Sequence, residues 1–159
     1  MNLERSIILE QIKIEVVLNG VGYDDRWPHA VVNVNEDTHF EGILKGEQAI
    51  NFKVDVEDSS SNCLDIIFDN HDMSDTVIDD VGAVIKGKWI TIENIKFEGI
   101  DLEHLLFDNG LITVNDEWYN KQDREEWPLK RRFETELSWN SKYTINFDCP
   151  LYIWLLENL

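Results

Sequence analysis

The stretch INFKVDVEDSSSNCLDIIF, residues 50–68, decides the fold class of this chain. Both of its halves alternate apolar with polar residues, the apolar positions being Ile50, Phe52, Val54 and Val56, then Leu64, Ile66 and Phe68. Strict alternation is typical of a β-strand with one buried face, and the polar segment between the halves is typical of a turn. The stretch therefore predicts two half-buried strands joined by a turn.

The same alternation continues on both sides of this stretch. Further strands are expected over residues 12–18, 30–34, 89–98, 111–114 and 143–147. Short strands about ten to fifteen residues apart, joined by Gly, Asn, Asp and Ser turns, are typical of a sandwich. We expect an all-β fold, an antiparallel β-sandwich resembling a jelly roll. Because 159 residues suffice for one core, we also expect a single domain over residues 1–159.

The alternation slips once, in KWITIENIKF at residues 88–97. Two isoleucines lie in one phase, whereas Ile95 and Phe97 lie in the other. One extra residue in a strand, a β-bulge, changes the phase and turns both halves toward the same face. The slip therefore predicts a bulge near Glu93 and Asn94.

The chain carries 32 acidic and 14 basic residues, which gives a formal net charge of −18. Such a surface repels nucleic-acid phosphates and anionic membranes, so we expect neither as a partner. No apolar run reaches the roughly 18 residues that a membrane helix needs, and we expect no membrane insertion. The charge otherwise indicates high solubility, or carboxylates that gather around cations or face a basic partner.

The pattern of residues also predicts the compartment of synthesis. Residues 1–18 lack the apolar core of a signal peptide, which indicates a protein made in the cytosol. Cys63 and Cys149 lie far apart and form no CxxC motif. In a reducing cytosol they are expected as two buried thiols, and a disulfide between them is the alternative.

Residues 116–136, DEWYNKQDREEWPLKRRFETE, break the strand pattern. They hold five of the 14 basic residues: Lys121, Arg124, Lys130, Arg131 and Arg132. Two interpretations fit this segment. It is either a solvated connector that its tryptophans pin to the body, or a basic docking arm on an acidic protein.

The chain closes with PLYIWLLENL, residues 150–159, where Pro150 is expected to open a short helix or a last strand. Such an apolar run is unfavourable in water unless it packs on something. Packing into the core of the same chain is one prediction. The other is a C-terminal anchor that docks on a neighbouring subunit through Tyr152, Trp154 and Leu155.

An acidic loop, DNHDMSDTVIDD at residues 69–80, lies between two of the expected strands. Calcium takes about six to eight oxygen ligands, and Asp69, Asn70, Asp72 and Asp75 are candidates to surround one ion. The spacing does not match an EF-hand. Acidic and small polar residues also simply form turns, so the loop is either a calcium site or an ordinary turn.

Motifs for catalysis are missing from the sequence. It contains no GxSxG elbow, no HExxH, no Walker loop and no GxGxxG, and its four histidines are scattered. Paired carboxylates for glycoside hydrolysis are available in any chain this acidic, but no pair stands out. We therefore expect that the protein is not an enzyme.

The order of features over residues 12–102 resembles the calcium-dependent xylan-binding carbohydrate-binding modules. The matching segments are IKIEVVLNGVGYDDRWPHAVVNVN, INFKVDVEDSSSNCLDIIFDN, DTVIDD and WITIENIKFEGIDL. The resemblance implies a β-sandwich that binds sugars without cleaving them. It also implies calcium at Asp69, Asn70, Asp72 and Asp75, where the ion would contact sugar hydroxyls. The sequence assigns no aromatic sugar platform.

The ending SWNSKYTINFDCPLYIWLLENL is similar to small virion-associated proteins of tailed marine phages. The match lies at Trp139-Asn140, Phe147, Pro150, Tyr152 and residues 154–159. This resemblance implies a virion protein that is made in the host cytoplasm.

Together these features predict a non-enzymatic structural or decoration protein of a phage virion, on the capsid surface, tail or a tail fibre. Its expected partners are other virion proteins and, through the calcium site, glycans, and we expect it to be oligomeric in the particle. A purely structural assembly protein without a ligand is one alternative. A free glycan-binding module is another.

Overall fold

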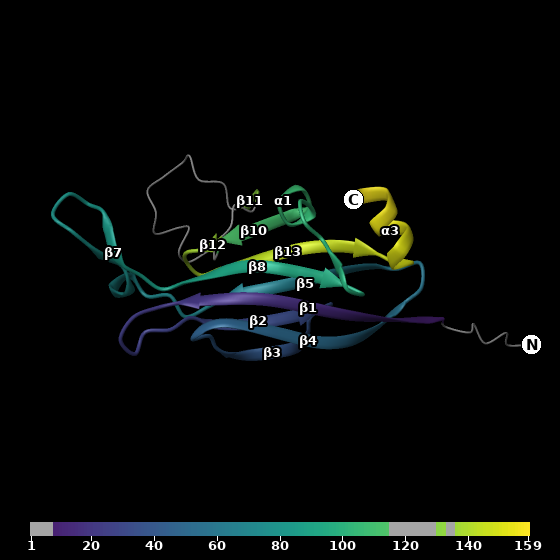
Figure 1. Ribbon diagram of the computed structural model, residues 1–159, viewed down its shortest axis with the longest axis horizontal. Coiled ribbons are helices and arrows are strands. Elements are labelled where there is room, and N and C mark those ends of the chain that lie inside the picture. The colour runs from purple at the N-terminus through teal and green to yellow at the C-terminus, as the bar shows by residue number, and fades with distance from the viewer. Residues whose placement is uncertain (1–7, 115–129, 133–135) are drawn as a thin grey trace, which may run out of the picture.

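The structure is a computed structural model that describes residues 8–114, 130–132 and 136–159. Its strands pair antiparallel in two main sheets that pack face to face (Figure 1). The prediction of an all-β, antiparallel sandwich is therefore confirmed. The predicted connector at residues 116–136 lies mostly outside the described residues.

The first sheet has the strand order β12-β8-β1-β4, with β9 beside β8. Long pairings join its central strand β1 to β4 and to β8. The bounds of these strands are β1 Leu9–Val21, β4 Gly46–Glu57, β8 Trp89–Phe97, β9 Ile100–Asp101 and β12 Glu136–Leu137.

The second sheet has the strand order β11-β10-β13-β5-β2-β3. Its bounds are β2 His29–Val34, β3 Asp37–Ile43, β5 Ser61–Phe68, β10 Gly110–Val114, β11 Lys130–Arg132 and β13 Ser141–Asp148. A two-residue turn joins β2 to β3, and both of its residues, Asn35 and Glu36, have positive φ, as such hairpin turns require. Because β4 and β5 belong to different sheets, the turn between them crosses the sandwich.

Of the remaining elements, the small hairpin and the last helix lie at the two ends of the sandwich (Figure 1). At one end are the 3-10 turn η1 (Met73–Asp75) and a hairpin of β6 (Val77–Ile78) and β7 (Val84–Lys86), which projects from the body (Figure 1). The short helix α1 (Leu105–Asp108) precedes β10, and α3 (Leu151–Asn158) lies at the opposite end from the hairpin. No helix in the described part of the chain is long and apolar enough to span a membrane.

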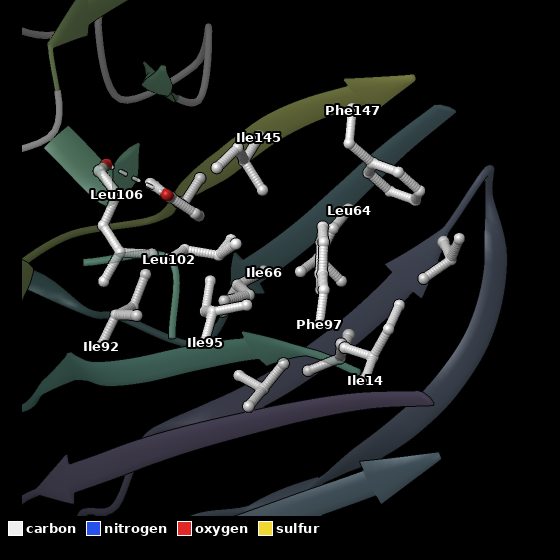
Figure 2. Close-up of a cluster of buried hydrophobic side chains, with 14 of the residues drawn as sticks. Ile14, Leu64, Ile66, Ile92, Ile95, Phe97, Leu102, Leu106, Ile145 and Phe147 are labelled. Atoms are coloured by element: carbon white, nitrogen blue, oxygen red, sulfur yellow. Dashed lines mark hydrogen bonds between the residues drawn. The ribbon is translucent and has the colours of Figure 1, made fainter. Parts of the chain in front are cut away.

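The core forms where the apolar phases of the two sheets meet. Figure 2 shows Ile95 and Phe97 of β8 together with Leu64 of β5 and Phe147 of β13, all of them buried. The rings of Phe97 and Phe147 meet edge to face with centroids 4.8 Å apart. Burial of each such side chain contributes about 1.5–3 kcal/mol, so the alternating strands supply the main force that holds the sheets together.

The predicted bulge in β8 is confirmed. Val17 of β1 pairs with Asn94 and Leu18 pairs with Ile92, so Glu93 has no partner in β1. The extra residue restores the phase, and the apolar side chains of both halves of β8 turn toward the core.

The C-terminal segment is a helix that closes one end of the core. Trp154 and Leu155 are buried, and the Trp154 ring lies 6.3 Å from the rings of both Phe97 and Phe147. These two predicted docking residues thus belong to the core of their own chain. Of the predicted anchor, Tyr152 is exposed.

Candidate functional site

Residues 69–88 connect β5 to β8 and form the end of the sandwich that faces away from α3 (Figure 1). The acidic loop comes first and contains η1. The β6–β7 hairpin follows and returns the chain to β8. All four predicted calcium ligands lie in the first part of this segment.

Asn70 joins the acidic loop to the start of β2. Its Oδ1 accepts a hydrogen bond from the His29 backbone N–H at 2.8 Å, and its Nδ2 donates to the Trp27 carbonyl at 3.0 Å. The neighbouring Asp69 places Oδ1 2.7 Å from Nδ1 of His29. Both ends of the Asn70 amide are therefore committed to backbone groups that order the loop.

A second asparagine holds the loop from the other side. Asn140, just before β13, accepts from the His71 backbone N–H at 2.7 Å and donates to the His71 carbonyl at 3.1 Å. The His71 ring lies against Phe68, edge to face, at 6.0 Å. Burial lowers the pKa of His71, which favours its neutral form.

Asp72 begins η1 through reciprocal hydrogen bonds. Its Oδ1 accepts from the backbone N–H and the hydroxyl of Ser74, each at 2.9 Å. In return Oδ2 of Asp75 accepts from the Asp72 backbone N–H at 2.8 Å, which completes a capping box. The bonds from Ser74 stabilise the charged carboxylate and lower the pKa of Asp72.

Asp75 is the buried centre of an ion-pair network. Its Oδ2 lies 2.8 Å from Nζ of Lys88, and its Oδ1 lies 2.9 Å from a terminal nitrogen of Arg26. The side chains of Asp75 and Lys88 are 4% and 7% exposed, whereas Arg26 is 44% exposed. The Lys88 ammonium also donates to the Asn70 carbonyl. The network thus ties the turn after β1, the acidic loop and the base of the hairpin to one another.

The pKa of Asp75 reflects two opposing effects. Burial by itself raises it, because a charged group loses hydration. The hydrogen bonds from Lys88, the Asp72 backbone and Arg26 outweigh burial, and the pKa of Asp75 lies below its ordinary value. Asp75 is therefore ionised at neutral pH and balances the buried charge of Lys88.

A tight turn after β1 brings Arg26 to this network. Tyr23 and Arg26 exchange two backbone hydrogen bonds, of 3.1 and 2.9 Å. A Cβ on Gly22 would lie 2.1 Å from the Arg26 carbonyl oxygen, so the turn closes only with glycine there. The Tyr23 hydroxyl donates to the Asp75 carbonyl at 2.8 Å. The turn and η1 are thereby docked on each other.

These contacts bear on the predicted calcium site. Both oxygens of Asp75 bond to cationic side chains or backbone, both ends of Asn70 bond to backbone, and Asp69 contacts His29. Within residues 8–114, 130–132 and 136–159, no group of three or more His, Cys, Asp or Glu side chains is placed to hold a metal ion. As placed, the four residues do not fit an ion that needs about six to eight oxygens. The calcium site stays a prediction.

A cavity of about 580 Å³ lies beside the acidic loop, at the base of the hairpin. We call it the root cavity. It is formed by residues from the loop, from β7 to the start of β8, and from β12 and the segment that joins it to β13. Its lining consists of His71, Met73, Thr76, Val84, Gly87, Lys88, Trp89, Glu136, Ser138 and Trp139.

The root cavity combines aromatic surface with polar groups. Trp89 begins β8 in the phase opposite to the buried Ile90, and Trp139 follows β12; both tryptophans are half-buried. Lys88 is held in place by Asp75, and the exposed carboxylate of Glu136 lies on the same lining. The cavity can therefore offer flat apolar contact together with hydrogen-bond donors and acceptors.

The chain matches no known family model. No curated protein matches it either. Among solved structures it is similar to a carbohydrate-binding module, "vCBM60 in complex with galactobiose", with 15% sequence identity and a TM-score of 0.47. The similarity covers 86% of this chain and 97% of that chain. Because this TM-score is low, the fold is assigned as a sandwich from the strand pairings of this chain alone.

The root cavity was not predicted from the sequence. Trp89 and Trp139 lie far apart in the chain, and the antiparallel pairing of β12 with β8 brings their surroundings together. The sequence does contain one indication of this cavity. Trp89 occupies the outward phase of a strand whose inward phase is fully apolar. An aromatic residue on the polar phase of a strand marks a surface where a ligand can bind.

The predicted basic docking residues are only partly described. Lys121 and Arg124 lie outside the described residues. Lys130, Arg131 and Arg132 form β11, which pairs with β10 at the edge of the second sheet. Docking through this segment stays a prediction.

Proposed function

We propose that this protein is a non-catalytic binding module that holds a neutral glycan in the root cavity. The observation that supports the proposal best is the convergence of Trp89 and Trp139 with ammonium, carboxylate and hydroxyl groups in one recess of about 580 Å³. A sugar ring has an apolar face of C–H groups and a rim of hydroxyls. Ligand pockets of this kind are mostly apolar and carry a few placed polar groups, which suits such a ring.

The ammonium of Lys88 is the most firmly placed of these polar groups. It has three N–H donors. Within the described residues, Asp75 and the Asn70 carbonyl take two of them, and the third suits a ligand hydroxyl. Glu136 can accept a hydrogen bond on the same lining, and Ser138 can donate or accept one.

Charge favours a neutral ligand. Lys88 is balanced by Asp75, and the net charge of −18 repels phosphates and polyanionic glycans. Among the described lining residues, Glu136 is the one carboxylate, whereas glycoside hydrolysis usually needs a pair. A sugar that is bound and not cleaved fits both observations.

The proposal is tested with a glycan array, followed by titration calorimetry with the neutral sugars that bind. Galactobiose and xylo-oligosaccharides belong in the first set of probes. We expect Trp89→Ala and Trp139→Ala each to weaken binding by about tenfold or more, because an aromatic side chain that covers a ligand contributes at least about 1.4 kcal/mol.

Trp27→Phe is the matched control, because Trp27 is a half-buried tryptophan that does not line the root cavity. It should bind like the wild type. If no neutral glycan binds, the proposed function is wrong. If a glycan binds and both alanine variants bind it equally well, the root cavity is not the site.

Thermal unfolding of the protein with added calcium and with excess EDTA tests the calcium prediction separately. A ligand that binds the native state alone raises the melting temperature, so calcium should do so if the acidic loop holds it. An unchanged melting temperature in both conditions would exclude the ion. No part of the proposed glycan contact depends on calcium.

Attachment to a virion is a proposal that rests on the resemblance of the C-terminal segment to phage proteins. One observation supports the alternative of a purely structural assembly protein. Large apolar side chains are exposed at both ends of the sandwich, and such surfaces commonly contact other proteins.

A further inference from the structure

The β6–β7 hairpin is an apolar projection. We call residues 77–86 the hairpin arm. Among its side chains Val81 is 87% exposed, Ile85 60% and Ile78 59%. Asp79 fixes the tip, because its Oδ1 accepts from the N–H of Val81 at 3.0 Å and of Ala83 at 2.9 Å. The arm therefore presents apolar side chains on a defined backbone.

An arm of this kind is unusual for a surface that faces water. Its strands have only two and three residues, and an isolated two-stranded ribbon is marginal in water. Contiguous exposed apolar side chains commonly mark a surface for another protein. Asp75 and Lys88 hold the arm's base, but they do not cover its tip.

The opposite end of the molecule carries a second apolar surface. The α3 face consists of Tyr152, Ile153, Leu156 and Leu159, and Leu156 is 84% exposed. The other side of the same helix supplies Trp154 to the core. A helix that is apolar on both sides is normally covered on both sides.

We propose that copies of this chain associate head to tail, with the hairpin arm of one copy packed on the α3 face of the next. Figure 1 shows the arm and α3 at opposite ends of the sandwich, so neither can cover the other within one chain. A single contact between two copies would cover both surfaces at once. Such a heterologous contact joins two different patches and repeats from copy to copy.

Local charge also suits this pairing. Glu10, Asp58 and Asp148 lie around Cys149 at the start of α3 and help to raise the pKa of that thiol to about 12, although burial is the larger cause. At the base of the arm, Arg26 and Lys86 lie over the Tyr23 ring, 5.9 and 5.5 Å from its centroid. The arm also carries the exposed Asp79 and Asp80, so both ends are acidic overall. Exposed Lys86 is the cation of the arm that can face the carboxylates beside α3 of the next copy.

The net charge of −18 distinguishes a second copy from a basic partner. Copies repel one another at low ionic strength, and salt screens this repulsion. Association of copies should therefore strengthen as NaCl is added. Binding to a basic partner would weaken under the same change.

The experiment is sedimentation velocity of the full chain over a range of concentrations, in about 0.05 M and about 0.5 M NaCl, which spans strong to weak screening. We expect concentration-dependent association that is stronger at the higher salt. Val81→Ser/Ile85→Ser and Ile153→Ser/Leu156→Ser should each weaken it by about tenfold or more, because central apolar contacts dominate interfaces. Far-UV circular dichroism and urea midpoints confirm that both variants are folded.

Mixing the two variants gives the decisive result. One variant keeps an intact α3 face and the other keeps an intact arm, so an equimolar mixture should form a dimer and no longer chain. A mixture that stays monomeric while the wild type associates would overturn the proposal, as would a wild type that is monomeric at both salt concentrations. If the α3 variant associates like the wild type, the contact joins arm to arm and the proposal is wrong.

This inference stands apart from the proposed function. Val81, Ile85, Ile153 and Leu156 do not line the root cavity. Both variants should therefore bind a neutral glycan as the wild type does, whether or not they associate.

Discussion

At the scale of the residue, Asp75 joins three segments that are distant in the sequence, and its removal should be costly. Asp75→Asn leaves the buried Lys88 ammonium without a counter-charge, and breaking a buried pair in this way costs about 3–5 kcal/mol. Lys88→Met should cost less, because Asp75 keeps the half-exposed Arg26 and the Asp72 N–H. Urea unfolding measures both free energies.

The double variant Asp75→Asn/Lys88→Met provides the control, because it removes both charges and should recover part of the loss. A loss below about 1 kcal/mol for Asp75→Asn, typical of an exposed pair, would contradict the buried ion pair.

The sign of the pH dependence follows from the lowered pKa of Asp75. In the unfolded chain this carboxyl takes up a proton near its ordinary value of 3.8, while in the folded protein it stays ionised to lower pH. Its contribution to stability is therefore complete above pH 3.8 and is lost as the pH falls through the folded pKa. The stability gap between wild type and Asp75→Asn should narrow over that range.

The sequence singles out Asp75 as one of four candidate calcium ligands, and the structure pairs it with Arg26 and Lys88. Local spacing groups it with nearby carboxylates, because spacing along the chain is all that a sequence displays. Arg26 and Lys88 could not be recognised as its partners, since a polar residue next to a glycine turn or a strand has no pattern that reveals a distant contact. The fixed position of Asn70 was equally invisible, because both of its bonds go to backbone.

At the scale of the element, the β8 bulge allows a test by deletion. Without Glu93, Val17 and Leu18 can still pair with Asn94 and Ile92, and every apolar residue of β8 keeps its inward phase. We expect the deletion to cost no more than about 1 kcal/mol, which is the loss of one locally favoured twist.

Deletion of Thr91 is the matched control, because it moves Ile90 out of the core phase. We expect the Thr91 deletion to lower the free energy of unfolding by about 3 kcal/mol, several times more than the Glu93 deletion. It exposes one large side chain and disturbs its neighbours. Urea unfolding compares the two. Equal costs would show that the phase of β8 is not set by this bulge.

Strands were predictable where one face is buried, because burial imposes a local period of two, as in β4 and β5. The hairpin arm was missed for the opposite reason: its valines and isoleucines face solvent, and acidic neighbours made the segment look like a loop. The form of the last segment stayed open between helix and strand. Apolar residues on both sides of α3 give it no clear period.

At the scale of the whole molecule, the excess of carboxylates should make stability depend on ionic strength. A net charge of −18 destabilises the compact state through self-repulsion, and salt screens it. Raising NaCl from about 0.02 M to about 0.3 M should therefore raise the melting temperature. The Val81→Ser/Ile85→Ser variant is used for this scan, so that association does not contribute.

Sucrose serves as the comparison, since it stabilises by exclusion from the protein surface without screening charge. A variant in which several exposed carboxylates are replaced by glutamine should lose most of its response to salt and keep its response to sucrose. An equal response to salt in that variant would show that self-repulsion is not the cause.

The position of the root cavity at the base of the hairpin arm has one more consequence. In a head-to-tail chain every junction would carry one cavity, so identical sites would repeat at a fixed spacing along the assembly. A polymeric glycan held at one site would meet the next at a high effective concentration. Avidity of this kind exceeds single-site affinity by about 10²–10⁴-fold, so sugar contacts that are weak in one copy would become durable adhesion in many.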